Sequence, residues 1–473
     1  MTFQLQQLMR IMIATAMLIS FAPAQAAEPV DHVVKIHLDP STVIGNIPDD
    51  FLGLGYETSA VAQPGFFSAK NIRMIHLYQN LGSHGLIRIG GNISDHTRFI
   101  PDGTATAKTE REVTIINRAC LNDLGDFARA TGWRVMWGLN LGTGTRGEAA
   151  DEAVAVDHAL GGSLQSFEIG NEVDLMRKFA KDFDAYHGAY SEYKAAIRAK
   201  LPHAVFSGPD SADSFEFVQK FVAAESADMA LATHHYYRGG ASDSRSTIRR
   251  ILIRDAAFDS RLEQLQTLCA PHQLGYRINE VNTFYGGGRE DVSDTFCSAL
   301  WCLDYVFDLA SHGCAGANLE TDINQLGFIS FYSPIVHDAA GVCSARPEYY
   351  GLLAFAMAGR GELLATHIEK DDRNLTAYAT RDPGGAIYLT VINKEFAEDA
   401  TIELALPAGF KAGEVFRLRA PYLNAKTEVT FAGSVVARDG SWKSVVSETA
   451  AVANGTAHFL VPHATAVVLR IKS

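Results

Sequence analysis

The sequence is poor in cysteine and in positive charge. Six cysteines among 473 residues are too few for a disulfide scaffold, and no two of them form a CxxC pair. Their spacing to histidine matches no zinc motif, so we expect no bound metal. The even number permits disulfides in an exported chain, although buried free thiols fit it equally well. With 41 Lys and Arg against 54 Asp and Glu, the net charge of −13 disfavours nucleic acid as a partner.

Long apolar runs are also scarce. An apolar stretch at residues 11–22 follows Arg10, but it is shorter than the roughly 20 residues that span a bilayer. Ala24 and Ala26 then provide the small side chains that a signal peptidase reads. We therefore expect residues 1–26 to be a signal peptide, and the mature protein to be periplasmic or secreted. No later stretch is long and uncharged enough to enter a membrane.

The length and the order of the apolar segments indicate two domains. A chain of 473 residues with 47% hydrophobic and 20% charged residues is typical of a folded protein that exceeds one ordinary core. Eight short apolar segments, each followed by a helix-like stretch, lie at 51–57, 86–91, 134–140, 166–172, 204–208, 229–235, 276–280 and 316–320. Strands buried on both faces that alternate with helices predict a parallel sheet. We predict an α/β fold with a (β/α)8 TIM barrel over residues 46–362.

The pattern changes after about Gly361. Short strand-like segments are separated by turn residues and lie at 375–380, 386–393, 414–418, 458–462 and 466–470. This pattern of short strands and turn residues is typical of an antiparallel β-sandwich, which we predict over residues 363–473. Another strand-like segment precedes the barrel, and we expect residues 27–45 to add a strand to that sandwich.

Polar residues gather at the ends of the predicted barrel strands. They are Glu57, Asn92, Asn140, Asn171, Glu172, His235, Glu280 and Glu320. In (β/α)8 barrels the carboxyl ends of the strands carry the active site. Any single one could be a strand-end cap, and Asn140, His235 and Glu320 fit a structural role as well as a functional one. Eight at one face indicate a catalytic site.

Glu172 and Glu280 have the placement that glycoside hydrolysis requires. That reaction uses two carboxyl groups, one that protonates the leaving oxygen and one that attacks or activates water. Glu280 follows Glu172 by 108 residues, about three βα units, so the two would end strands four and seven and face each other across the barrel mouth. Asn171 can bind the sugar hydroxyl beside the reacting carbon. A structural ion pair with an arginine is the alternative role for Glu172.

Four segments of the barrel resemble glycoside hydrolase family 79, the β-glucuronidase and heparanase family. They are 87–92 (IRIGGN), 166–172 (SFEIGNE), 234–237 (HHYY) and 280–288 (EVNTFYGGG). The resemblance implies a clan A barrel with a β-sandwich, retention of configuration, Glu172 as acid/base and Glu280 as nucleophile. It also implies a carbohydrate as the partner and no metal or organic cofactor.

The resemblance further implies a binding site for a glucuronate carboxylate. Tyr285, Gly286 and Gly287 fall where family members contact that group, and Tyr332 is a second candidate contact. A phenol O–H and backbone N–H groups bind a carboxylate without a buried cation, which reconciles an acidic protein with an acidic sugar. Packing, or a flexible glycine turn, is the alternative role of these residues.

The same resemblance implies contacts at two more places. Glu57 and Asn92 lie where family members hold the hydroxyls far from the reacting carbon, and Glu57 could equally be a capping residue. Either Tyr237 or Tyr236 would orient the nucleophile, and the motif leaves open which of them does so.

The prediction is a retaining, exo-acting β-glucuronidase that releases terminal β-linked glucuronic acid from glycans or glycoconjugates by double displacement. The scarcity of basic residues argues against an endo-acting, heparanase-like enzyme, since the densest basic group is Arg245, Arg249, Arg250 and Arg254. A glycosidase of the same clan for a neutral sugar is an alternative, as is a carbohydrate-binding protein on a hydrolase fold. The sequence leaves the oligomeric state open.

Overall fold

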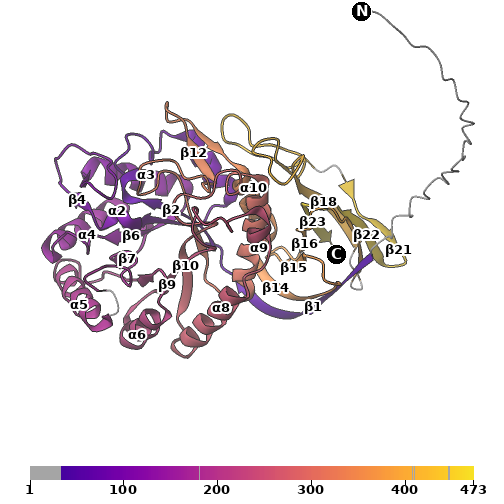
Figure 1. Ribbon diagram of the computed structural model, residues 1–473, viewed down its shortest axis with the longest axis horizontal. Helices are drawn as coiled ribbons and strands as arrows, with labels where there is room; N and C mark the ends of the chain where they lie inside the picture. Colours follow the sequence, from indigo (N-terminus) through magenta and orange to yellow (C-terminus); the bar gives the residue numbers. More distant parts are fainter. Residues whose placement is uncertain (1–32, 180–181, 407–408, 410, 446–447, 473) are drawn as a thin grey trace, which may run out of the picture.

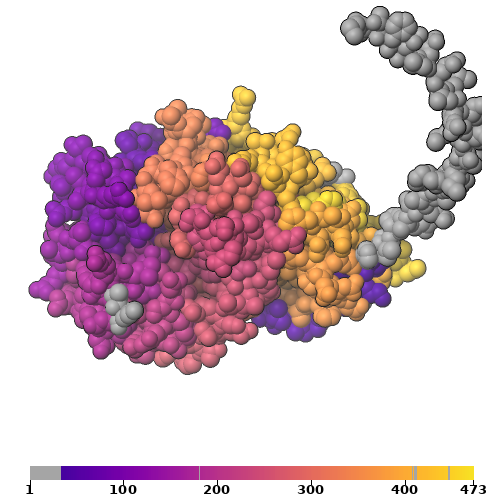
Figure 2. Space-filling view, viewed as in Figure 1, coloured from indigo at the N-terminus to yellow at the C-terminus, as the bar shows by residue number. Residues whose placement is uncertain are grey.

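The computed structural model describes residues 33–179, 182–406, 409, 411–445 and 448–472. The predicted signal peptide, residues 1–26, lies outside these ranges. Figure 1 shows a barrel with helices around it and, beside the barrel, a sheet that contains the C-terminus. In the space-filling view the sheet unit, orange to yellow, abuts one side of the barrel (Figure 2).

Eight parallel strands form the barrel, so the predicted fold class is confirmed. They are β2 (Leu52–Glu57), β3 (Leu86–Gly90), β6 (Arg134–Leu139), β7 (Leu164–Ile169), β8 (Gly208–Ser211), β9 (Leu231–Tyr237), β10 (Gly275–Asn282) and β11 (Ala317–Glu320). Their spatial order is β7-β6-β3-β2-β11-β10-β9-β8, and a bridge between Phe167 and Phe206 closes the ring. Glu172 therefore follows the fourth barrel strand, and Glu280 lies in the seventh.

The fifth barrel strand lies later in the chain than predicted. Residues 204–207 contribute only the bridge at Phe206, and β8 begins at Gly208. Pro209 has no N–H to donate, and β8 pairs with β9 at Gly208 and Ser211 with an irregular register between them. Asp210, in that irregular stretch, has a left-handed backbone (φ 56°) and is buried.

Helices cover the outside of the barrel. They are α1 (Ile72–Leu81), α3 (Arg118–Thr131), α4 (Arg146–Leu160), α5 (Phe183–Lys200), α6 (Phe215–Glu225), α8 (Ala256–Cys269), α9 (Phe296–Ser311) and α10 (Pro347–Ala358), with the short α2 (Gly91–Ser94) and α7 (Ile248–Leu252) in loops. Two small ribbons also lie in loops: β4 (Thr97–Phe99) with β5 (Thr114–Ile116), and β12 (Ile335–His337) with β13 (Cys343–Ala345). Between barrel and sheet, α9 and α10 are buried on nearly all sides, as their apolar composition requires (Figure 1). No helix in the described ranges is long and apolar enough to cross a membrane.

The second unit is one sheet of eleven strands. They are β1 (Val33–Ile47), β14 (Gly361–Glu369), β15 (Leu375–Arg381), β16 (Ile387–Asn393), β17 (Ala400–Ala405), β18 (Lys411–Arg419), β19 (Thr430–Phe431), β20 (Glu448–Thr449), β21 (Ala451–Ala453), β22 (Thr456–Val461) and β23 (Thr465–Lys472). The described pairings are antiparallel except for β1 with β17. The N-terminal strand β1 lies between β14 and β17, so both ends of the described chain belong to this sheet.

The sheet has two apolar faces. On β16, Leu389 and Val391 belong to the core of the sheet itself, whereas Tyr388 and Ile392 belong to the core shared with the barrel. This division follows from the period of two in a strand. The sheet's own core also brings together residues of β17 and β18, which lie far apart in the strand order, so the sheet curls over its inner face.

The six cysteines are all free thiols. Cys269, Cys297, Cys302, Cys314 and Cys343 are buried, and Cys120 is half-buried. Burial raises the pKa of each of these thiols above its usual value. The cysteines therefore serve as packing residues, which was one of the two possibilities that the sequence left open.

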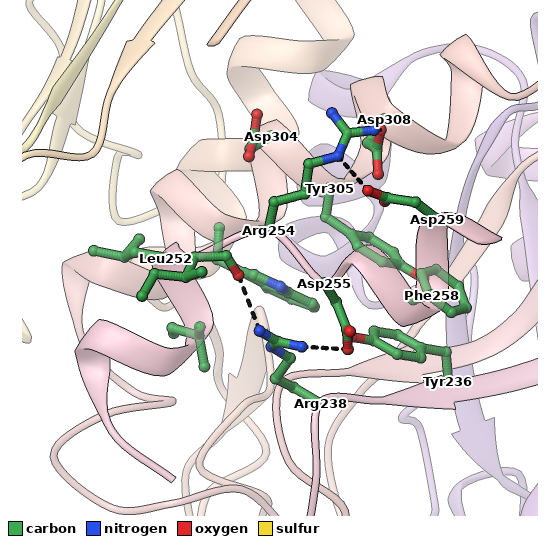
Figure 3. Close-up of a pocket in the computed structure, with 13 residues that line it drawn as sticks. Tyr236, Arg238, Leu252, Arg254, Asp255, Phe258, Asp259, Asp304, Tyr305 and Asp308 are labelled. Carbon is green, nitrogen blue, oxygen red and sulfur yellow. Dashed lines mark hydrogen bonds and ion pairs between the residues drawn. The ribbon is translucent and has the colours of Figure 1, made fainter. Parts of the chain in front are cut away.

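A buried ion pair joins the barrel to the sheet. Asp304 on α9 contacts Lys394, which follows β16 and whose side chain is 1% exposed. The hydroxyls of Thr376 and Tyr378 on β15 also donate to Asp304, at 2.6 and 2.9 Å. Figure 3 shows Asp304 beside a cavity of about 40 Å³, whose walls include the ion-paired side chain of Arg254.

We expect Asp304→Ala to destabilise the protein strongly, because it leaves the ammonium of Lys394 buried and unpaired. Loss of one partner of a buried ion pair costs about 3–5 kcal/mol, and the free energy of unfolding in urea should fall by that amount. The control is Glu112→Ala, which breaks an exposed pair with Lys108 and should cost less than about 1 kcal/mol. Equal effects of the two substitutions would contradict the role assigned to Asp304.

Candidate active site

A pocket of about 400 Å³ opens at the carboxyl ends of the barrel strands. Its volume is in the range of sites for small molecules. Eight of the ten predicted site residues line it: Glu57, Asn92, Glu172, Tyr237, Glu280, Tyr285, Gly286 and Tyr332. The other two, Asn171 and Gly287, are buried next to lining residues. His235, Glu320 and Gln325 line the pocket as well.

Glu172 is placed by a tight turn after the fourth barrel strand. β7 ends at Ile169, and then Gly170 (φ 85°) and Glu172 (φ 47°) adopt left-handed backbone conformations. For a residue other than glycine this strain costs about 1–3 kcal/mol, and it concentrates at functional sites. The turn is held in part by Asp95, which accepts a hydrogen bond from the Asn171 amide (3.1 Å). As a result the Glu172 side chain lies in the pocket and is 20% exposed.

Glu280 is placed by an irregularity within β10. Against β9, Asn279 is an extra residue between the pairs Ile278–His234 and Glu280–His235, as in a β-bulge. In a regular strand, neighbouring side chains point to opposite faces. Here both Asn279 and Glu280 lie inside the barrel: Asn279 donates to two buried carboxyl groups beneath the pocket, and Glu280 lines the pocket itself.

A fully buried arginine lies beneath Glu280. The Arg88 side chain, in the middle of β3, has no exposed surface. Its guanidinium donates to Glu280 Oε2 (2.7 Å), Asn171 Oδ1 (2.6 Å), Asp210 Oδ2 (3.0 Å) and Glu168 Oε2 (3.2 Å). One cation therefore holds together side chains from the second, fourth, fifth and seventh barrel strands or the turns after them, namely at β3, β7, β8 and β10.

Two side chains of β9 contact the glutamates. His235 Nδ1 lies 3.3 Å from Glu172 Oε1 and 3.7 Å from Glu280 Oε2. The Tyr237 hydroxyl donates to Glu280 Oε1 (3.0 Å). The Tyr236 hydroxyl instead donates to an aspartate away from the glutamates, since neighbouring strand residues point to opposite faces. Tyr237 is therefore the tyrosine that contacts Glu280.

The surroundings give Glu172 and Glu280 different protonation states. Burial would raise the pKa of Glu280, but His235, Arg88 and the Tyr237 hydroxyl lower it below its usual value. Burial raises the pKa of Glu172, which exceeds its usual value despite the hydrogen bond with His235. An oxygen of each glutamate and a nitrogen of His235 lie within 4.8 Å of one another. A carboxyl group with a lowered pKa and one with a raised pKa therefore face the same space, as acid–base chemistry requires.

Two more carboxyl groups line the pocket at the ends of the first and eighth barrel strands. Glu57 and Glu320 are each 4% exposed. Glu57 Oε2 accepts a hydrogen bond from the Ile93 amide (2.8 Å), and burial raises the pKa of Glu57 to about 8. Burial and then the Glu280 carboxylate raise the pKa of Glu320 well above its usual range. Asn92, next to Glu57, accepts a hydrogen bond from the Asn171 side chain (3.1 Å).

The segment after β10 is a turn of three glycines at the pocket rim. Gly286, Gly287 and Gly288 have φ of 83°, 89° and 82°, a region that other residues rarely adopt. A Cβ at position 287 would also lie 2.5 Å from Phe328, so this backbone needs glycine for space. Within the described residues, the amides of Gly286 and Gly287 donate to no acceptor, which leaves two N–H groups for a ligand.

The two tyrosines predicted to contact a carboxylate differ in their environment. Tyr332 is 3% exposed, and its ring centroid lies 6.1 Å from that of Tyr237. Tyr285 packs over Gly240, where a Cβ would lie 2.9 Å from the ring, and Tyr285 is 61% exposed. Tyr332 therefore forms part of the pocket wall, and Tyr285 forms part of the rim.

The site fits proton transfer better than metal binding. Within the described residues, Glu172, His235 and Glu280 are the group of side chains whose ligand atoms lie close enough to hold a metal ion. Glu280 already accepts hydrogen bonds from Arg88 and Tyr237. The guanidinium charge beside it disfavours a second cation at that carboxylate.

Four residues of the site, Arg88, Glu168, Asp210 and Asn279, had no role in the sequence prediction, which left the role of His235 open. Arg88 and His235 contact the glutamates directly. Glu168 and Asp210 accept hydrogen bonds from Arg88, and Asn279 donates to both of these carboxyl groups. A signal for part of this network exists in the sequence, because a charged residue stands inside each of the apolar strands β3 and β7. A buried charge requires a partner, so an arginine and a glutamate in such strands predict each other.

The chain is similar to glycosidases along most of its length. Residues 377–468 match the glycosyl hydrolase family 79 C-terminal beta domain. A beta-glucuronidase of Aspergillus niger is 22% identical, and the match covers 89% of this chain and 86% of the relative. A heparanase of Gallus gallus is 22% identical, with 78% of this chain and 79% of the relative covered.

Solved structures with this fold are glycosidases as well. A 4-O-alpha-L-rhamnosyl-beta-D-glucuronidase from Fusarium oxysporum superposes with a TM-score of 0.75 at 17% identity, covering 92% of this chain and 99% of its own. An alpha-L-arabinofuranosidase from Thermotoga maritima gives a TM-score of 0.69 at 16% identity, with 92% and 99% covered. At these identities the likeness shows the barrel and sheet architecture alone, which enzymes for different sugars share.

We expect Arg88→Met to lower the free energy of unfolding by about 3–5 kcal/mol at neutral pH, because it leaves buried carboxylates without their cation. In the wild type the pKa values of Asp210 and Glu280 are lowered, so their stabilising contribution is present above the unfolded pKa of about 4 and is lost below it. The deficit of the variant should therefore shrink as the pH falls through about 4.

Urea denaturation at neutral and at acidic pH measures this difference. The control is Arg118→Met, which breaks an exposed pair with Asp102 and should change little at either pH. A deficit of Arg88→Met that did not depend on pH would contradict the proposed electrostatic cause.

Proposed function

Because the chain belongs to glycoside hydrolase family 79, we propose that it is a retaining, exo-acting β-glucuronidase that releases terminal β-linked glucuronic acid from glycans or glycoconjugates. The observation that carries the proposal is the pair of glutamates at the barrel mouth, in which the pKa of Glu280 is lowered and that of Glu172 is raised. Export from the cytoplasm, by way of the predicted signal peptide, is part of the proposal.

The two glutamates would act in two steps. In the first step, ionised Glu280 attacks the anomeric carbon, and the bond to the leaving oxygen breaks while Glu172 gives that oxygen its proton. In the second step, Glu172 accepts a proton from water, and the water oxygen displaces Glu280 from the anomeric carbon. Arg88 and Tyr237 hold Glu280 ionised and fix its two oxygens, one at each side.

The distance between the glutamates supports retention of configuration. Retaining enzymes hold the two carboxyl groups about 5–5.5 Å apart, and inverting enzymes hold them about 6.5–9.5 Å apart to admit a water molecule. One oxygen of Glu172 lies within 4.8 Å of one oxygen of Glu280, which supports the shorter separation of a retaining enzyme. The pocket therefore favours direct attack by Glu280.

The glycine turn and the tyrosines support a uronic acid as the substrate. Two free amides, at Gly286 and Gly287, and the buried phenol of Tyr332 are neutral donors suited to a carboxylate. Relatives and a structural neighbour named as glucuronidases point to the same sugar. A neutral sugar of the kind processed by the arabinofuranosidase neighbours is the competing substrate.

The charge distribution supports exo action. A long sulfated chain requires a basic cleft, and the group Arg245, Arg249, Arg250 and Arg254 does not provide one. Arg245 and Arg250 pair with Asp243, and Arg254 pairs with Asp259. The helix α7 spans only Ile248–Leu252, so the four arginines do not share one helix face.

We expect kcat/KM for p-nitrophenyl β-glucuronide to exceed that for p-nitrophenyl β-glucoside by at least about 100-fold. The reason is the loss of two hydrogen bonds to a charged group, each worth about 1.5–3 kcal/mol. Initial rates of the purified protein measure the ratio. If the protein hydrolysed only the glucoside, it would be a glycosidase, but the assignment as a glucuronidase would be wrong. If it bound both compounds without hydrolysing either, a carbohydrate-binding protein would be favoured.

The two glutamates should respond differently to the leaving group. Glu172→Gln removes the general acid, so it should slow methyl β-glucuronide, a poor leaving group, by about 100- to 10,000-fold. It should slow the first step with p-nitrophenyl β-glucuronide much less, because that leaving group departs without protonation. Glu280→Gln should abolish turnover of both substrates. Burst-phase kinetics measure the rate of the first step. If Glu172→Gln slowed this step equally with methyl and p-nitrophenyl β-glucuronide, the assignment of Glu172 as the acid would be contradicted.

A further inference from the structure

Glu320 has an unusual position among the four glutamates that line the pocket. Each of the other three has a hydrogen-bond partner for its carboxyl group: the Ile93 amide for Glu57, His235 for Glu172, and Arg88 with Tyr237 for Glu280. Glu320 Oε2 has no partner within the described residues, although the side chain is buried to all but 4%. A buried polar atom without a partner is costly, and the carboxyl group to which this oxygen belongs lines the pocket.

The surrounding backbone is built to hold this carboxyl group in place. Glu320 pairs with Gly55 across the β11–β2 contact, and a Cβ at position 55 would lie 2.5 Å from Glu320 Oε2. A side chain at position 55 would occupy the space that the Glu320 carboxyl group fills, so this position requires glycine. On the other side, the Asn282 side chain donates to the backbone oxygen of Glu320 (3.1 Å), which fixes the end of β11.

The charges that face Glu320 come from every neighbouring strand. They are Glu57 on β2, Arg88 on β3, Glu172 after β7, Tyr237 on β9, Glu280 on β10 and Tyr332 after β11. Burial, Glu280 and Glu57 raise the pKa of Glu320, and Arg88 opposes them without reversing the direction. These influences favour the protonated form of Glu320, in which the side chain offers an O–H donor to the pocket.

We propose that Glu320 is a substrate-binding residue that determines specificity, and that its acid O–H donates a hydrogen bond to the carboxylate of the glucuronic acid beside Tyr332. This inference rests on the proposed function, since it names a further contact for the same sugar. It adds an acidic side chain to a carboxylate site that otherwise consists of amides and phenols.

The chemistry of the pocket favours the sugar carboxylate as the acceptor. Among the ionisable groups around Tyr332, Glu320 has the largest electrostatic effect on the pKa of its phenol, and Tyr332 is a proposed carboxylate contact. A protonated acid and a carboxylate form a short, strong O–H···O⁻ hydrogen bond. The bond keeps the proton on the protein side or shares it, so that the bound pair has one negative charge and needs no buried cation.

The sign of the pH dependence follows from this bond. Below the raised pKa of Glu320 the donor is present and the glucuronide binds. Above that pKa, Glu320 becomes an anion that repels the sugar carboxylate and leaves a neutral sugar unaffected. The preference for glucuronide over glucoside should therefore decline as the pH rises, independently of Glu172, whose titration affects both substrates alike.

The test is the ratio of kcat/KM for p-nitrophenyl β-glucuronide to that for p-nitrophenyl β-glucoside, on the acid and the alkaline side of neutrality. Glu320→Leu removes the donor and should lower the ratio about 10- to 100-fold at acid pH. Glu320→Gln keeps an N–H donor that does not titrate, so the ratio should stay high at acid pH and decline less at alkaline pH. Glu152→Gln is the control, because Glu152 is another buried carboxyl group with a raised pKa, remote from this pocket.

The outcomes separate the inference from the proposed function. A wild type without preference for the glucuronide would overturn both. A wild type that prefers the glucuronide, with an unchanged ratio in Glu320→Leu, would overturn the role of Glu320 alone. If Glu320→Leu does not fold, Glu320→Gln provides the test. If the ratio of kcat/KM values in Glu320→Gln depended on pH as it does in the wild type, the inference would be overturned. A weaker pH dependence of that ratio would support it.

Discussion

The buried guanidinium of Arg88 is the interaction on which the rest of the active site depends. It lies at the centre of a barrel whose mouth is lined by four glutamates, and it donates to Glu280, Asp210 and Glu168 together. A charge in this position would be prohibitively costly without partners, and the carboxylates would be equally costly without the charge. The cation and the anions therefore stabilise one another, and the strands that carry them are held in register.

The balance between burial and neighbouring positive charge sets the direction in which the pKa of each glutamate is shifted. Glu280, in contact with Arg88 and close to His235, has a lowered pKa, whereas burial outweighs attraction at Glu172, Glu57 and Glu320, whose pKa values are raised. The pocket thus places one carboxyl group with a lowered pKa among three with raised pKa values. Protonated acids donate hydrogen bonds to an anion instead of repelling it, so this arrangement is compatible with the anionic sugar of the proposed function.

The eleven-stranded sheet lies outside the active site and contributes none of the residues that line the pocket in the described part of the chain. The sheet joins both ends of the described chain, and its outer face packs on α9 and α10, which in turn cover the barrel. A buried ion pair, Asp304 with Lys394, joins the sheet to α9. Arabinofuranosidases share this architecture at low identity, so the fold leaves the substrate open and single side chains of the pocket decide it.

The sequence alone determined the barrel, the C-terminal sheet and the pair Glu172 and Glu280. These features depend on local patterns, namely apolar strands alternating with helices, turn residues, and acids at strand ends. Only the tertiary structure decided that Tyr237 contacts Glu280 while Tyr236 turns away, that an extra residue in β10 directs both Asn279 and Glu280 inward, and that Glu320 Oε2 has no partner. The physical reason is that a contact, a bulge or a pKa depends on groups from strands far apart in the chain. Arg88 and Glu280 are 192 positions apart and 2.7 Å from each other, a proximity that no local pattern encodes.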